Sequence, residues 1–195
     1  MDRKYIKVMF GNKSYYENNV YEYKINKVNI AECWNPNDLQ NIWGFNFSTE
    51  DKIARWLVRS DTIYDVTIPY DAEIIEVTSE SSPHGVFRSN KIILRNPRKI
   101  TDELALELYR KSNLPEKSYF KTLAGYAIRG HINAEKEIIK DKVNYDNIEL
   151  VLCEINDFCK PDKGKFETGS YDCYIEIINI LKNILIEKNK KLGDC

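Results

Sequence analysis

Ser48 and Thr49 are the residues of this 195-residue chain whose types and placement most suggest a chemical role. Their hydroxyl groups follow Phe45-Asn46-Phe47, whose alternation is typical of a short strand with one buried face. Asn46, Ser48 and Thr49 are therefore candidate ligand contacts at the end of that strand. We prefer the interpretation that Ser48 is a helix N-cap, because its hydroxyl can accept a hydrogen bond from a first-turn backbone N–H.

Trp34 and Trp43 flank a stretch of turn-forming residues, Asn35-Pro36-Asn37-Asp38. Rings of this size need somewhere to be buried. They either line a ligand pocket or partner site, or they pack against the edge of a sheet. We favour packing, because aromatic side chains serve protein cores far more often than binding sites.

A basic cluster lies between residues 88 and 99, made up of Arg88, Lys91, Arg95, Arg98 and Lys99. Such a cluster could contact phosphate groups, and Arg88 is a further candidate ligand or partner contact. Lysine and arginine on a sheet edge also prevent edge-to-edge pairing, which is the simpler explanation. Because the net charge of the chain is -1, we expect no nucleic-acid binding.

The five cysteines are odd in number and widely spaced, as reduced thiols usually are and as a disulfide framework is not. We also expect no metal site, because the chain lacks a CxxC pair and only His84 and His131 could supplement the cysteines. No stretch approaches the roughly 18 apolar residues of a membrane helix. Met1-Asp2-Arg3-Lys4 leads into no apolar signal segment, so we expect a protein that is neither membrane-bound nor secreted.

The elements that must position these residues fall into two halves. Residues 1–100 predict a small α+β unit with a mixed sheet and one crossover helix, in which the helix capped by Ser48 runs to Ser60-Asp61. Asn96-Pro97 should end the last strand, because proline cannot donate to a ladder. The predicted strands are Tyr5–Phe10, Tyr21–Ile25, Phe45–Phe47, Ile63–Ile68, Ala72–Val77 and Asn90–Arg95.

Residues 101–195 predict an α-helical layer, because their apolar residues repeat every three or four positions. Thr101 is a good N-cap for its first helix, and Gly130 should end its second. The last helix, from about Tyr171 to Lys188, is apolar on more than one side. Such a helix is either sandwiched or waiting for a partner, so it could serve homo-oligomerisation.

Gly44-Phe45-Asn46-Phe47-Ser48-Thr49, with Ala54 and Trp56 beyond, resembles the second conserved region of ADP-ribosyltransferase-like proteins. The resemblance implies that Ser48 and Thr49 help to hold NAD. Two features depart from that family. Phe10 stands about where its first strand carries histidine or arginine, and no late catalytic glutamate can be placed.

Residues 127–133, Ala-Ile-Arg-Gly-His-Ile-Asn, are similar to the inner part of an ankyrin repeat. No second copy follows at the repeat's period of about 33 residues. The similarity therefore implies at most one degenerate ankyrin-like unit within the helical half.

Short stretches spread over residues 5–158 carry a broader resemblance. They are Trp34-Asn35-Pro36, Gly44-Phe45-Asn46-Phe47-Ser48, Trp56-Leu57-Val58-Arg59, Asp61-Thr62-Ile63-Tyr64-Asp65-Val66, Val86-Phe87-Arg88-Ser89-Asn90-Lys91-Ile92-Ile93 and Ser118-Tyr119-Phe120. Together they resemble an uncharacterised paralogous family of giant DNA viruses of amoebae, of the mimivirus type. The resemblance implies a viral protein of host cytoplasm or virion, and it lends no activity.

These observations predict an α+β protein with a sheet unit at 1–100 and a helical domain at 101–195. We expect a non-enzymatic protein-interaction module that acts on host or virion proteins and uses no cofactor. The alternative is an ADP-ribosyltransferase-like enzyme that uses NAD. No catalytic residue can be named from the sequence; the candidate contacts are Trp34, Trp43, Asn46, Ser48, Thr49 and Arg88.

Overall fold

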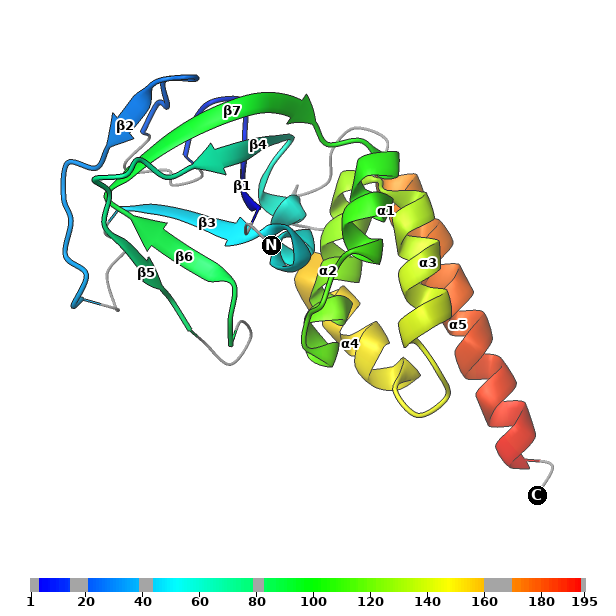
Figure 1. Cartoon of the computed structure of the whole chain (residues 1–195). Helices are drawn as coiled ribbons and strands as arrows, with labels where there is room; N and C mark the ends of the chain where they lie inside the picture. Colours follow the sequence, from blue (N-terminus) through cyan, green and yellow to red (C-terminus); the bar gives the residue numbers. More distant parts are fainter. Residues whose placement is uncertain (1–3, 15–20, 39–43, 79–82, 160–169, 194–195) are drawn as a thin grey trace. The chain divides into compact units, whose positions relative to one another are not determined.

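The computed structural model describes residues 4–14, 21–38, 44–78, 83–159 and 170–193 (Figure 1). The contacts within the chain divide it into two units. The first unit comprises Met1–Ile100 together with Lys111–Leu114, and the second comprises Thr101–Arg110 together with Pro115–Cys195. The first unit contains the strands and the second the α-helices, so the fold class is α+β, as predicted.

A seven-stranded sheet forms the first unit, in the order β2-β7-β4-β1-β3-β6-β5. Every pairing between these strands is antiparallel, whereas we expected a mixed sheet. The strands are β1 (Tyr5–Met9), β2 (Val28–Ile30), β3 (Phe45–Thr49), β4 (Thr62–Thr67), β5 (Ile74–Glu76), β6 (Val86–Ser89) and β7 (Lys91–Lys99).

A 3₁₀ helix, η1 (Glu50–Arg59), connects β3 to β4. Both strands pair with β1, which lies between them and runs antiparallel to each, so η1 is a crossover helix, as predicted. The helix buries Ile53, Ala54 and Leu57 and ends at Ser60, whose N–H donates to the carbonyl of Leu57. This burial holds a run of 3₁₀ helix far longer than the three or four residues that are usual.

Aromatic side chains pack together on one face of the sheet. Phe45 and Phe47 share one side of β3, as predicted, and both are buried. Phe47 stacks on Phe87 of β6 at 5.9 Å between ring centroids, and Tyr5 meets both rings edge-on at 5.2 and 5.1 Å. Such edge-to-face and offset contacts are the favourable arrangements for aromatic pairs.

Three strand predictions were wrong in detail. Tyr21–Ile25 forms only isolated bridges, and β2 begins three residues later. The strand β6 had not been predicted. The strand β7 continues through Asn96-Pro97 to Lys99, because Asn96 takes a left-handed φ of 50° in an irregularity of the β4–β7 ladder. There Ile63 pairs with Arg98 and Asp65 with Arg95, so Pro97 need not donate to the ladder.

The second unit is built from α1 (Asp102–Arg110), α2 (Glu116–Arg129), α3 (Ile132–Lys142), α4 (Ile148–Cys159) and α5 (Ser170–Gly193). The helix α2 is central: it packs against α3, α4 and α5, and Leu123, Ala124 and Tyr126 are fully buried. The predicted helix boundaries at Thr101 and Gly130 are confirmed. Thr101 Oγ1 accepts from the N–H of Leu104 at 3.3 Å, and Gly130 ends α2 at a φ of 72°.

Candidate functional site

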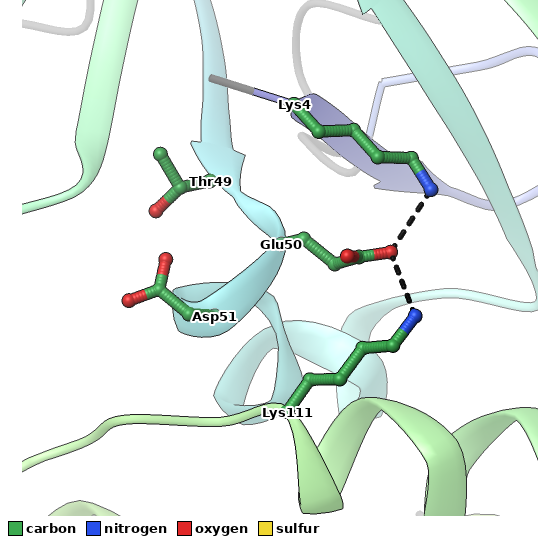
Figure 2. Close-up of a pocket in the computed structure, with 5 residues that line it drawn as sticks. All are labelled: Lys4, Thr49, Glu50, Asp51 and Lys111. Atoms are coloured by element: carbon green, nitrogen blue, oxygen red, sulfur yellow. Dashed lines mark hydrogen bonds and ion pairs between the residues drawn. The ribbon is translucent and has the colours of Figure 1, made fainter. Parts of the chain in front are cut away.

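An open pocket of about 260 Å³ lies in the first unit where β3 passes into η1. It is lined by Thr49, Glu50 and Asp51 at this junction and by Lys4 and Lys111. Figure 2 shows the Glu50 side chain between the two lysines, while Thr49 and Asp51 lie on the other side of the turn. The pocket therefore gathers two ammonium groups and two carboxylates around one helix start.

Glu50 is the centre of this arrangement. Its Oε1 accepts hydrogen bonds from Lys4 Nζ at 2.9 Å and from Lys111 Nζ at 3.4 Å. Partial burial alone would raise the pKa of Glu50, but the hydrogen bond and charge of Lys4 and the charge of Lys111 lower it below the ordinary 4.5. Glu50 is thus held ionised and serves as an acceptor, unlike a general acid, whose pKa must be raised.

The start of η1 is also tied to the segment Lys111–Leu114. The carbonyl of Asp51 accepts from the N–H of Asn113 at 2.9 Å, and the ammonium group of Lys52 donates to the carbonyl of Asn113. Lys52 also makes an ion pair with Asp51 at 3.2 Å. One main-chain and one side-chain hydrogen bond thus hold Asn113 against the start of η1, so Lys111 reaches Glu50 from an anchored segment.

Ser48 does not cap η1, and our preferred interpretation of it was wrong. Ser48 is buried within β3, and its hydroxyl donates to the carbonyl of Gly85 at 2.8 Å. Thr49 occupies the N-cap position but makes no capping hydrogen bond with its side chain. The carbonyl of Gly85 attracts both residues, since it also accepts from the N–H of Thr49 at 2.9 Å.

The other sequence candidates lie elsewhere in the first unit. Trp34 Nε1 donates to Glu73 Oε2 at 2.8 Å, and its ring packs against Gly44, where an added Cβ would come within 2.7 Å of the ring. Asn46 pairs with Arg88 across β3 and β6. Trp43 lies outside the described residues. Of the five candidates that the structure describes, Thr49 alone is among the residues that line the pocket.

Three of the five cations of the basic cluster, Arg88, Lys91 and Arg98, are buried or partly buried. Arg88 is buried, and its Nη2 donates to the carbonyl of Asp38 at 3.3 Å. Two further cations of the cluster, both partly buried, are engaged with carboxylates of the same unit. Arg98 bonds Asp65 at 3.0 Å, and Lys91 bonds Asp71 at 2.5 Å.

Two ionisable groups that the sequence reasoning missed are partly or fully buried. Lys7 of β1 donates to the carbonyl of Asn46 at 2.6 Å, and burial lowers the pKa of Lys7 to about 8. Glu135 of α3 is fully buried, and neither of its carboxylate oxygens has a hydrogen-bond partner among the described residues. Burial, and after it the charges of Asp102 and Glu176, raise the pKa of Glu135 to about 9. A signal was present for Lys7, which interrupts an apolar strand, but alternation alone did not place its side chain inside.

Within the described ranges, no three histidine, cysteine, aspartate or glutamate side chains come together as metal ligands would, and no helix is long and apolar enough to span a membrane. Among the described residues, charged side chains gather around a cavity at Glu50. No protein-family model, curated protein or solved structure matches the chain. A function must therefore be proposed from the chemistry of the chain's own surfaces.

Proposed function

We propose that this protein is a non-enzymatic interaction module that binds another protein through α5. The supporting observation is that α5 carries exposed apolar side chains on a helix that is only half embedded in its own unit. Tyr171, Ile175 and Ile186 are 47%, 39% and 50% exposed. Apolar surface of this kind on a helix is typical of a contact site for a partner.

The two halves of α5 differ in how they pack. The first half is buried against the other helices of the second unit through Tyr174, Ile177, Ile178 and Leu181. Among residues 182–191, by contrast, no side chain is buried, although this stretch includes three consecutive large apolar residues, Ile184 to Ile186. Figure 1 shows the last turn of α5 extending beyond the other helices of this unit. The helix is thus longer than its own core requires.

The pocket beside Glu50 supports a non-enzymatic role. Its central carboxylate has a lowered pKa and already accepts from two lysines, so it is poorly suited to exchange protons with a substrate. The contacts between Lys4, Glu50 and Lys111 instead join distant parts of the first unit. We infer a structural role for this ion network.

The resemblance to proteins of amoebal giant viruses supports the choice of partner. On that basis we propose that the module acts in host cytoplasm or in the virion, on a host or viral protein. The test uses the full chain as bait in a lysate of infected amoebae, beside the double variant Ile175→Glu/Ile186→Glu. Tyr70→Ser is the matched control, because Tyr70 is a fully exposed aromatic residue of the first unit.

We expect a protein that is retained by the wild type and by Tyr70→Ser and lost with the α5 variant. Circular dichroism should show that the variant keeps its helix content. Retention of the same proteins by all three baits, or of none by the wild type, would contradict a docking role for α5.

One observation favours a second candidate, an NAD-using transferase: Thr49 and Glu50 line the same pocket. Under this alternative Thr49 and the lysines would meet the nucleotide, whereas Ser48 is buried and bonded to Gly85. Calorimetry with NAD tests it. Heat of binding at millimolar NAD that is abolished in Thr49→Val and in Lys111→Met would favour the enzyme, and no heat would end the proposal.

A further inference from the structure

Eight exposed residues of α5 lie on one side of the helix: Tyr171, Asp172, Ile175, Asn179, Lys182, Ile186, Asn189 and Lys190. At about 3.6 residues per turn they fall within an arc of about 100°, and we call this arc the open face of α5. The buried residues Tyr174, Ile177, Ile178 and Leu181 all fall outside this arc. The open face is therefore a continuous strip along the whole helix.

Charge is distributed unevenly along this strip. Asp172 lies at its beginning, and Lys182 and Lys190 lie in its second half. A second α5 laid against it in the same direction would bring Asp172 to Asp172 and Lys190 to Lys190. Laid in the opposite direction, it would bring the acidic end of each helix to the basic end of the other.

The spacing of the apolar residues also fits an antiparallel pair of α5 helices. Ile175 and Ile186 are eleven residues apart, which is about three turns and about 16 Å along a helix. In an antiparallel pair centred between residues 180 and 181, Ile175 of each copy faces Ile186 of the other. The same register sets Tyr171 beside Lys190, where a cation–π contact can form, and brings Asp172 within one residue of it.

From this complementarity of charge and apolar spacing, we propose that a second copy of this chain docks antiparallel on the open face of α5. This inference rests on the proposed function in one respect, that α5 is a docking surface. It adds that the molecule docked there is a second copy of the chain. Each contact between the two copies occurs twice, once on either side of the two-fold axis, as in an isologous dimer.

Sedimentation equilibrium of the full chain measures the self-association. We expect a monomer–dimer equilibrium, and we expect Ile175→Glu to raise the dimer dissociation constant by about tenfold or more, because each dimer contains the contact twice. Tyr70→Ser again serves as control and should leave the constant unchanged. Unchanged circular dichroism excludes unfolding as the cause.

Charge reversal tests the direction of the helices. Asp172→Lys and Lys190→Asp should each weaken the dimer, and the double variant Asp172→Lys/Lys190→Asp should restore it, since the opposite charges again meet. In a parallel dimer the double variant would restore nothing.

A wild-type chain that stays monomeric at every concentration would overturn this inference. So would a dimer indifferent to substitutions on the open face. Either outcome leaves the proposed function standing if a different protein is still captured through α5. A dimer without any further captured protein would instead leave this inference standing and contradict the action on host or virion proteins.

Discussion

Glu50 accepts hydrogen bonds from two ammonium groups that lie 46 and 61 residues away in the chain. Nothing in the local sequence predicts such a partner for it, because an acidic residue in a first turn is fully explained by the helix dipole. The lysines are 47% and 44% exposed in their side chains, so solvent screens both contacts. The network is therefore expected to add little to the free energy of unfolding.

A double-mutant cycle on Glu50→Gln and Lys111→Met should give a coupling free energy below about 1 kcal/mol at neutral pH. The pKa of Glu50 is lower in the folded than in the unfolded protein. Its stabilising contribution is therefore present above the ordinary value of 4.5 and is lost as the pH falls through the folded-state pKa. Urea unfolding over a series of pH values from 7 downward measures both statements; coupling that does not fall as the pH is lowered through the acid range would contradict them.

The pKa of Glu135 is shifted in the opposite direction to that of Glu50. Its pKa is raised from 4.5 to about 9, first by burial and then by Asp102 of α1 and Glu176 of α5, while Lys136 of its own helix lowers it. Burial raises the pKa of the Cys173 thiol on α5, and the charge of Glu135 adds to that shift. In the unfolded chain this carboxyl ionises above about 4.5, and in the folded protein it stays protonated to about 9. The second unit therefore loses stability as the pH rises between those values.

We expect Glu135→Met to stabilise the protein by about 3 kcal/mol at pH 7, because it removes the cost of keeping a buried carboxyl protonated. At pH 4 the gain should nearly vanish. Urea unfolding curves of wild type and variant at both pH values provide the measurement, with Glu107→Met as a control at an exposed position of α1. An equal difference at the two pH values would show that Glu135 is ionised in the folded state.

At the scale of elements, Gly44 shows how a single backbone position fixes the entry to β3. It has a φ of 79°, and an added Cβ would approach the carbonyl oxygen of Ser89 and the Trp34 ring, each at 2.7 Å. Trp34 is thereby held over the strand, with its indole N–H bonded to Glu73. The packing interpretation of this tryptophan thus has a geometric cause in the missing side chain of Gly44.

Gly44→Ala should destabilise the first unit by about 2 kcal/mol or more, through backbone strain together with overpacking. Gly11→Ala is the matched control, because Gly11 also has a positive φ, of 53°, but no atom lies within 4 Å of its added Cβ. The control should lose only about 1 kcal/mol. Chemical denaturation measures the loss in free energy of unfolding for each variant. Similar losses in the two would show that the contact with Trp34 does not contribute to the effect of Gly44→Ala.

The sequence predicted those features that depend on neighbouring residues and missed those that depend on distant segments of the chain. The cap at Thr101 and the end of α2 at Gly130 follow from neighbouring residues, and both were predicted. Ser48 misled because a serine before two acidic residues fits a cap, whereas its actual acceptor, the carbonyl of Gly85, lies 37 residues away. The ion pairs of the pocket and the burial of Glu135 likewise depend on contacts between distant segments, which periodicity cannot supply.

At the scale of the whole molecule, the sheet and the helices form two units whose boundary in the sequence is not a single point. After Ile100 the chain forms α1 in the second unit, returns to the first unit for Lys111–Leu114, and then leaves it again at Pro115. The predicted change of periodicity after Ile100 marks the first of these passages. The four-residue return carries no periodic signal, because it is too short to show one.

This return has a consequence for synthesis on the ribosome. Leu114 is buried, and the main-chain partner that Asn113 gives to Asp51 belongs to the first unit. When residue 100 has emerged, the nascent sheet still lacks these contacts, and α1 must be translated before they can form. The first unit can therefore reach its final state only after part of the second has left the exit tunnel, so the two cannot mature strictly one after the other.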